Sequence, residues 1–140
     1  MTLDIDRLET TFAQIKDHEK AFTAAFYDRL FADYPDVKPL FAHAQMQQQG
    51  EKLFKSLVFV VENLRQPAVL DNSLKALGTR HVKYGVLPSH YPMVGGALLK
   101  TFEAFLGPAW DAAAQQAWVK AYQAVTQIML DGEGFDYDVK

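Results

Sequence analysis

The amino-acid sequence predicts an all-α protein whose helices pack irregularly. Apolar residues recur at helical spacing along most of the chain, no segment shows the alternation typical of a half-buried strand, and proline and glycine separate the helical pieces. These pieces are unequal in length and carry no heptad repeat, so neither a coiled coil nor a simple up-and-down bundle is expected. The chain of 140 residues is expected to form one domain over residues 1–140.

The first two helices are expected over residues 4–16 and 18–33. Each repeats apolar residues three or four positions apart, so one face of each helix should point inward. Tyr34-Pro35 should end the second helix, because the residue before a proline disfavours the helical conformation. The residues expected to face inward are Leu8, Phe12, Ile15, Phe22, Phe26, Tyr27, Leu30 and Phe31.

A short turn over residues 36–41 leads into the middle of the chain. A long helix is expected over residues 46–65, with a wide apolar stripe on one face. Pro67 then opens a further helix that ends near Gly85, because the first turn of a helix tolerates the missing proline N–H. The stripe of the long helix consists of Leu53, Phe54, Leu57, Val58, Val61 and Leu64.

Two last helices are expected over residues 90–106 and 110–130, separated by a Gly-Pro pair. Gly95 and Gly96 lie inside the first of them, where glycine lowers helix propensity. We therefore expect the backbone of another element to approach closely at this pair.

A histidine stands on the apolar face of the helix that starts at Pro67. A lone histidine there is usually a core residue bonded to a backbone carbonyl, but imidazole is also a common metal ligand. The chain has no cysteine, and no second histidine or carboxylate cluster lies at ligand spacing, so a cage of protein groups alone is not expected. A haem iron needs only one protein ligand. The apolar face in question consists of Leu70, Leu74, Leu77, His81 and Tyr84.

Four segments of the sequence together resemble bacterial globins. They follow the family's order over about residues 5–133 and read FYDRLFADYPDVKPLF, QGEKLF, LGTRHVKYGVLPSHYPMVG and AWVKAY. The sequence is most similar to the haem domain of flavohaemoglobins and to single-domain bacterial haemoglobins. This resemblance implies a globin fold, an irregular three-over-three helical sandwich around haem b, with His81 as the proximal ligand of a five-coordinate iron.

The resemblance also assigns the distal side of the haem. Tyr27 and Gln49 match the family's distal tyrosine and glutamine, which donate hydrogen bonds to bound O₂ as it gains negative charge. Leu53, four residues after Gln49, is expected to pack over the same side. By spacing alone, Tyr27 could instead be a core aromatic, and Gln49 could be a solvated residue, with Gln47 and Gln48 leaving the register open.

On the proximal side, the family surrounds the histidine with a tyrosine and a glutamate, which Tyr91 and Glu133 match. Such a network makes the imidazole more electron-donating and favours chemistry on O₂ over reversible carriage. Glycines flank Glu133, so its engagement is left open. Further haem contacts are expected from Phe41, Leu77 and Val94. The candidates for its propionates are Arg80, Lys83 and His43, and His43 is also a candidate for an alternative iron contact.

Composition and charge narrow the functional classes. The net charge of -3 argues against nucleic acid as the main partner, because phosphate binding relies on a basic surface. The N-terminus shows no secretory signal, and no apolar run reaches the length of a membrane span. A cytoplasmic protein without a membrane partner is expected, either a monomer or a homodimer.

Two functions follow from the resemblance. One is a haem globin that binds O₂ and other diatomic ligands such as NO and CO, for storage, transport or sensing. The other is nitric oxide dioxygenation, a detoxification in which NO and O₂ give nitrate; it would need a separate flavin reductase, because the 140 residues include no such module. The sequence contains no residue that would indicate peroxidase-like or sulfide-binding behaviour. The presence of His81, Tyr27 and Gln49 argues against a globin-like scaffold that binds no haem.

Overall fold

A computed structural model describes residues 3–132, and these residues form α-helices and short 3₁₀ helices without any strand. The all-α prediction is therefore confirmed. The α-helices are α1 (Ile5–Ile15), α2 (Glu19–Asp33), α3 (Met46–Glu62), α4 (Pro67–Lys83), α5 (His90–Leu106) and α6 (Ala112–Gly132). The 3₁₀ helices are η1 (Lys16–His18), η2 (Pro35–Phe41) and η3 (Gly107–Ala109).

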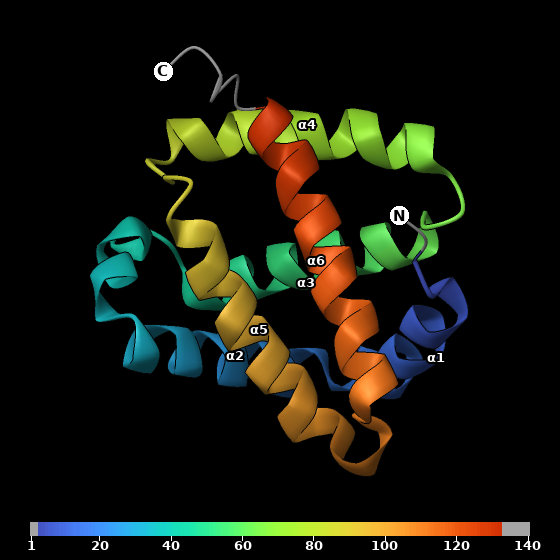
Figure 1. The fold of residues 1–140 in the computed structure, drawn as a ribbon. Helices are drawn as coiled ribbons and strands as arrows, with labels where there is room; N and C mark the ends of the chain where they lie inside the picture. The colour runs from blue at the N-terminus through green and yellow to red at the C-terminus, as the bar shows by residue number, and fades with distance from the viewer. Residues whose placement is uncertain (1–2, 133–140) are drawn as a thin grey trace.

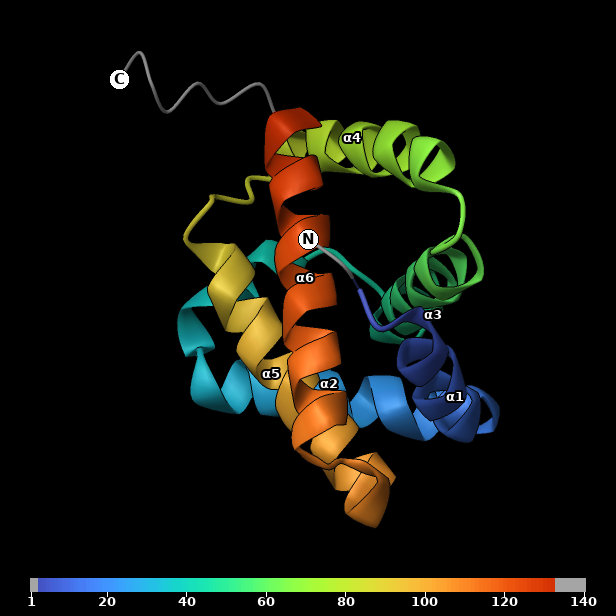
Figure 2. The ribbon, with the colours of Figure 1, turned by 45° about the vertical axis from the view of Figure 1, so that its right-hand side comes forward.

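The helices cross one another in two layers rather than lying parallel. In Figure 1, α5 and α6 run side by side in front of α2, and α4 crosses one end of α6. Figure 2 shows α3 on the far side from α5, packed near α1 and α2. Within residues 3–132, no helix is both long enough and apolar enough to cross a membrane.

The main core lies where α1, α2, α5 and α6 meet, and it is built from aromatic rings. Phe102 stacks on Trp118 with ring centroids 4.2 Å apart, and it packs against Phe22 at 5.1 Å. The indole N–H of Trp118 donates to the Thr11 hydroxyl at 2.9 Å, so the one polar atom of this buried ring is satisfied. Phe54 of α3 joins these rings, with its centroid 5.5 Å from that of Phe12, and Leu70 and Leu74 of α4 belong to the same buried cluster.

Helix ends differ from the sequence prediction by up to three residues, because short polar side chains decide them. The α3 helix ends at Glu62 rather than at residue 65, and the Asn63 side-chain amide there donates to the Phe59 carbonyl at 2.8 Å. The α6 helix begins at Ala112, where an Asp111 carboxylate oxygen accepts the Ala114 N–H at 2.8 Å. Such caps satisfy groups that the helix itself leaves unpaired.

Two glycines lie in close contact with α6. A Cβ atom on Gly95 would lie 2.5 Å from the Tyr122 ring, so another element does approach closely, but the expected approach of a backbone is wrong because side chains face both glycines of the pair. At Gly78, a Cβ atom would collide with the backbone carbonyl of Met129. Both α4 and α5 are thus held tightly against α6.

The prediction that Tyr84 faces inward is wrong. Its side chain is 62 % exposed, because α4 already ends at Lys83 and Gly85, with φ +84°, turns the chain away. Of the expected apolar face, Leu70 and Leu74 are buried, whereas Leu77 and His81 are only half-buried. The end of α4 that carries His81 therefore borders open space.

Candidate functional site

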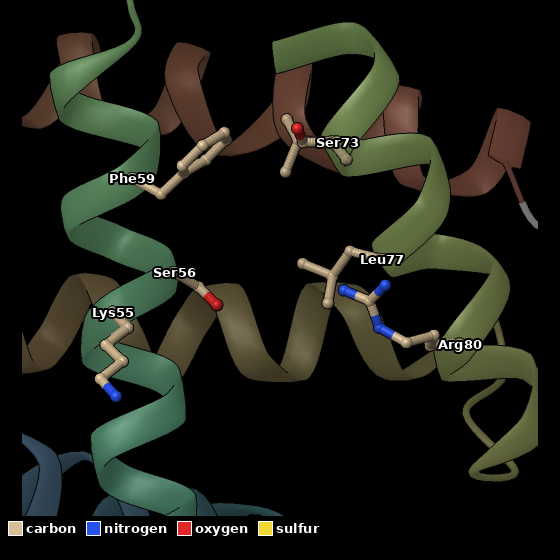
Figure 3. A pocket seen from close by; sticks show the side chains of 7 residues that line it. Lys55, Ser56, Phe59, Ser73, Leu77 and Arg80 are labelled. Carbon is tan, nitrogen blue, oxygen red and sulfur yellow. The ribbon is translucent and has the colours of Figure 1, made fainter. Parts of the chain in front are cut away.

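A cleft of about 260 Å³ separates α3 from α4. Figure 3 shows Ser56 and Phe59 of α3 pointing across it toward Ser73 and Leu77 of α4. The walls combine apolar and basic side chains, and the lining residues are Lys55, Ser56, Phe59, Ser73, Leu74, Leu77 and Arg80. Arg80 stands at the end of this lining, next to His81 in the sequence.

The His81 ring is oriented by its own helix. Its Nδ1 lies 2.8 Å from the Leu77 carbonyl oxygen. A carbonyl oxygen only accepts hydrogen bonds, so Nδ1 carries the proton in this bond, and the neutral ring has its lone pair on Nε2. This tautomer, fixed by a bond at the opposite nitrogen, is the usual state of a metal-ligating histidine.

Two tyrosine rings lie near His81, the residue expected on the proximal side. The Tyr91 ring centroid lies 6.5 Å from that of His81, and Tyr91 is 6 % exposed. The ring centroid of the exposed Tyr84 lies 6.0 Å from that of His81. The structure thus brings Tyr91 to His81, whereas Glu133 lies outside the described residues.

The structure brings together Tyr27 of α2 and Gln49 of α3, the two residues expected on the distal side. Tyr27 is buried. Burial raises the pKa of Tyr27 to about 12, although the neighbouring Gln49 side chain acts in the opposite direction. The phenol is therefore neutral at physiological pH and keeps a proton to donate. Gln47 and Gln48 are exposed, so Gln49 is the glutamine that meets Tyr27.

Aromatic rings pack around Tyr27. The Phe41 ring meets the Tyr27 ring edge-on with centroids 5.5 Å apart. Phe31 contacts both, at 5.9 Å from Tyr27 and 5.4 Å from Phe41. The sequence analysis placed Phe31 on the inward face but gave it no site role, although its position four residues after Tyr27 puts both on one face.

The other expected site residues divide between the cleft and its surroundings. Leu77 and Arg80 line the cleft, whereas Leu53 and Val94 are half-buried and pack against the core. The remaining two candidates for propionate contacts, Lys83 and His43, are exposed and do not line it.

Four cleft residues escaped the sequence analysis. Phe59 lies off the expected apolar stripe of α3. A large apolar residue outside that stripe indicates that this side of the helix is also shielded from solvent. Lys55, Ser56 and Ser73 are ordinary surface types and give no sequence signal.

The donor set fits a haem better than a bare metal ion. Within residues 3–132, no group of three or more His, Cys, Asp or Glu side chains could hold an ion. A single imidazole completes a metal site only when the remaining ligands come from elsewhere, as a porphyrin supplies them. The apolar walls around Leu77 and Phe59, with Arg80 at the end, suit a flat apolar ring with acidic substituents.

Comparison with known proteins also indicates a haem-binding protein. The sequence profile of the globin family matches residues 24–129. A globin-like protein of Aquifex aeolicus is 31 % identical over 88 % of this chain and 86 % of its own length. The flavohemoprotein of Vibrio cholerae is 27 % identical over 95 % of this chain, which spans only 34 % of that relative's length.

Solved structures extend the similarity to the fold. An engineered carbene transferase, made from a candidate nitric oxide dioxygenase of Rhodothermus marinus, superimposes with a TM-score of 0.84 at 25 % identity. The superposition covers 95 % of this chain and 94 % of that one. The chain therefore belongs to the globin family, with the all-α fold and the haem binding that membership implies.

Proposed function

We propose that this chain binds haem b between α3 and α4 and holds O₂ or another small gas on a five-coordinate iron, for oxygen binding, storage or transport. The observation that carries the proposal is the pairing of two features. His81 lies near one end of α4 with its Nδ1 bonded to the Leu77 carbonyl, and the buried Tyr27 lies beside Gln49 of α3. One imidazole and one pair of donors are what a gas-binding haem requires.

The distal pair is aligned with the cleft through α3. Gln49, Leu53 and Ser56 are spaced four and three residues apart, so they share one face of this helix. Ser56 lines the cleft, and the face therefore leads from the cleft to the Tyr27 hydroxyl. Haem supplies an iron centre that binds diatomic gases and transfers electron density to O₂.

The residues of the chain would stabilise the bound gas and hold the haem. Tyr27 and Gln49 would donate hydrogen bonds to a bound gas that carries negative charge, which would slow its release. Phe41, Leu53, Leu77 and Val94 would pack on the ring and exclude water, and Arg80 would pair with a propionate.

Nitric oxide dioxygenation with a separate reductase is the second candidate. The buried Tyr27–Gln49 pair favours it, because strong donors hold O₂ long enough to meet NO. The likeness to flavohemoproteins and to the candidate nitric oxide dioxygenase points the same way. Tyr91, and Glu133 if it reaches His81, would make the imidazole more electron-donating, and a flavin reductase would return the haem to the ferrous state.

Stopped-flow mixing of the oxygenated protein with NO distinguishes the two candidates. A dioxygenase converts NO to nitrate within the mixing experiment and turns over repeatedly once a flavin reductase and a nicotinamide cofactor are supplied. A binding globin holds O₂ tightly and reversibly but shows no sustained turnover with the same reductase. A protein that does not bind O₂ at all would contradict both.

A further inference from the structure

We propose that the exposed end of α4 and the loop after it form a docking surface for an acidic flavoprotein that donates electrons. This docking surface consists of Val82, Lys83, Tyr84 and Leu87, and Arg80 borders it on the side of the cleft. The inference rests on the proposed function, and within it on the candidate that needs a separate reductase.

Exposed apolar side chains gather at this surface. The described part of the chain has four exposed large apolar residues, and three of them, Val82, Tyr84 and Leu87, lie within six positions of one another. The fourth, Val69, stands near the other end of α4. Scattered exposed apolar residues are ordinary, but a group of them in one place usually marks a surface that binds a partner.

Unpaired positive charge accompanies these apolar side chains. Residues 72–102 contain no aspartate or glutamate, although the whole chain has a net charge of -3. Two of the four lysines and arginines in this range form ion pairs with aspartates outside it. The other two, Arg80 and Lys83, form no ion pair with any residue that the structure describes. Their charge therefore remains available to attract an acidic partner.

The docking surface lies beside the histidine that would bind the iron. Figures 1 and 2 both show the loop between α4 and α5 at the edge of the molecule, where a partner can reach it. The Tyr84 ring centroid is 6.0 Å from that of His81, and Val82 follows His81 directly in the sequence. A protein that docks here would bring its redox group close to a haem held by His81.

The size and composition of the surface suit a brief encounter. Weak electron-transfer complexes bury less than about 1,200 Å² in total, and interfaces are enriched in tyrosine and arginine relative to the rest of the surface. A few apolar side chains beside two cations meet both conditions. The cations would speed the approach of an acidic donor, and the apolar side chains would hold it during the transfer.

The transfer itself involves one electron. Dioxygenation of NO leaves the haem iron ferric, so the iron has to be reduced before O₂ binds again. The reduced flavin of the docked donor loses one electron, and the ferric iron gains it and becomes ferrous. The donor recovers its electrons from a nicotinamide cofactor through a reductase of its own.

The test uses flavodoxin, a small acidic flavoprotein, as the donor and follows reduction of the ferric haem protein by stopped flow. Lys83→Glu reverses a charge of the docking surface, and Val82→Ser removes an apolar side chain from it. Val69→Ser is the matched control for the second variant, because Val69 lies on the same helix and is 39 % exposed, against 42 % for Val82. Lys20→Glu, at an exposed position of α2, is the control for the first.

Two readouts are needed, the rate of reduction and the affinity of the complex. Lys83→Glu should lower the second-order rate constant roughly fivefold at low salt, and this difference should shrink as added salt screens the charges. Val82→Ser should lower it roughly threefold at every salt concentration, because it removes apolar contact. Binding of oxidised flavodoxin, measured by NMR titration of the carbon monoxide-bound protein, should weaken by similar factors. Both controls should match the wild type.

Three outcomes would overturn the docking surface. The first is an equal rate constant and affinity in the wild type and both surface variants. The second is slower reduction of these variants by photoreduced lumiflavin as well, or loss of their haem, since a small donor needs no docking surface and the residues would then act on the haem. The third is a loss of binding to vesicles of anionic lipid with unchanged reduction by flavodoxin, which would make the surface a membrane contact.

Failure of the proposed function has a different signature. A wild-type protein that takes up no haem would contradict that function, and the inference would fall with it. A wild type that binds haem and O₂ normally, but whose reduction by flavodoxin is insensitive to Lys83→Glu and Val82→Ser, would contradict the docking surface alone.

Discussion

A tyrosine that stays protonated far above neutral pH is a dependable hydrogen-bond donor, and Tyr27 is such a residue. Its burial dominates its pKa, and the neighbouring Gln49 side chain has a smaller effect in the opposite direction. The residue types and their family-like segments were visible in the sequence, but the contact between them was not. Which of three consecutive glutamines meets Tyr27 depends on how α3 is rotated, and the packing of the whole helix decides that.

Removing the Tyr27 hydroxyl should speed the release of O₂. Tyr27→Phe loses a hydrogen bond to a charged acceptor, worth about 1.5–3 kcal/mol, so the dissociation rate should rise roughly 10- to 100-fold. Flash photolysis or ligand-displacement stopped-flow measures this rate. Tyr34→Phe, at the end of the same helix, is the control and should change it little. Equal rates in the wild type and Tyr27→Phe would remove Tyr27 from the distal role.

Stability should fall at high pH through the same residue. The pKa of Tyr27 is raised in the folded protein to about 12 from an unfolded value of 10.0, so its contribution is fully present below pH 10 and is lost as the pH rises toward 12. Between about pH 9 and about pH 11.5, the wild type should lose roughly 2 kcal/mol more of its unfolding free energy than Tyr27→Phe. Urea unfolding of both proteins at the two pH values measures the difference, and parallel losses would show that Tyr27 titrates normally.

At the scale of elements, α4 is held mainly by α6. Leu70 and Leu74 of α4 belong to the core, and α4 meets the α6 backbone through the close contact at Gly78. Periodicity in the sequence predicted where α4 runs, because apolar residues recur at helical spacing along it. The same periodicity does not indicate what Gly78 contacts, because a glycine can face either solvent or a carbonyl group.

Adding one methyl group at Gly78 should loosen α4. Alanine normally stabilises a helix relative to glycine by about 0.5–1 kcal/mol, but here its Cβ would meet the Met129 carbonyl, which is backbone and cannot rotate away. Gly78→Ala should therefore destabilise the protein by about 1–3 kcal/mol and speed haem loss.

Thermal unfolding and haem transfer to an acceptor protein measure both effects. Asn72→Ala, at an exposed position of the same helix, is the control and should leave stability and haem retention nearly unchanged. A Gly78→Ala protein as stable as the wild type would mean that α4 and α6 can separate slightly at no cost.

Across the whole molecule, the sequence predicted the class of fold and the histidine but not the shape of the cleft. Helical spacing shows which residues turn away from solvent, yet it cannot tell burial in a protein core from burial against a cofactor. Phe59 and Tyr84 illustrate the two errors: one lines the cleft although it lies off the stripe, and the other continues the stripe although it is exposed. Phe59 lines the cleft, and Tyr84 follows the end of α4 that carries Arg80 and His81, so both errors fall near the candidate site.

Ligation of haem iron by His81 is the central claim, and titration of the purified chain with haemin, followed by absorption spectroscopy of the reduced form, tests it most directly. His81→Gly is compared with His90→Gly, a matched change at a histidine whose ring only accepts the Leu87 N–H at 3.0 Å. We predict that the wild type and His90→Gly bind one equivalent and give a five-coordinate ferrous spectrum. His81→Gly should lose this spectrum and regain it with added imidazole. An unchanged spectrum in His81→Gly would contradict the account.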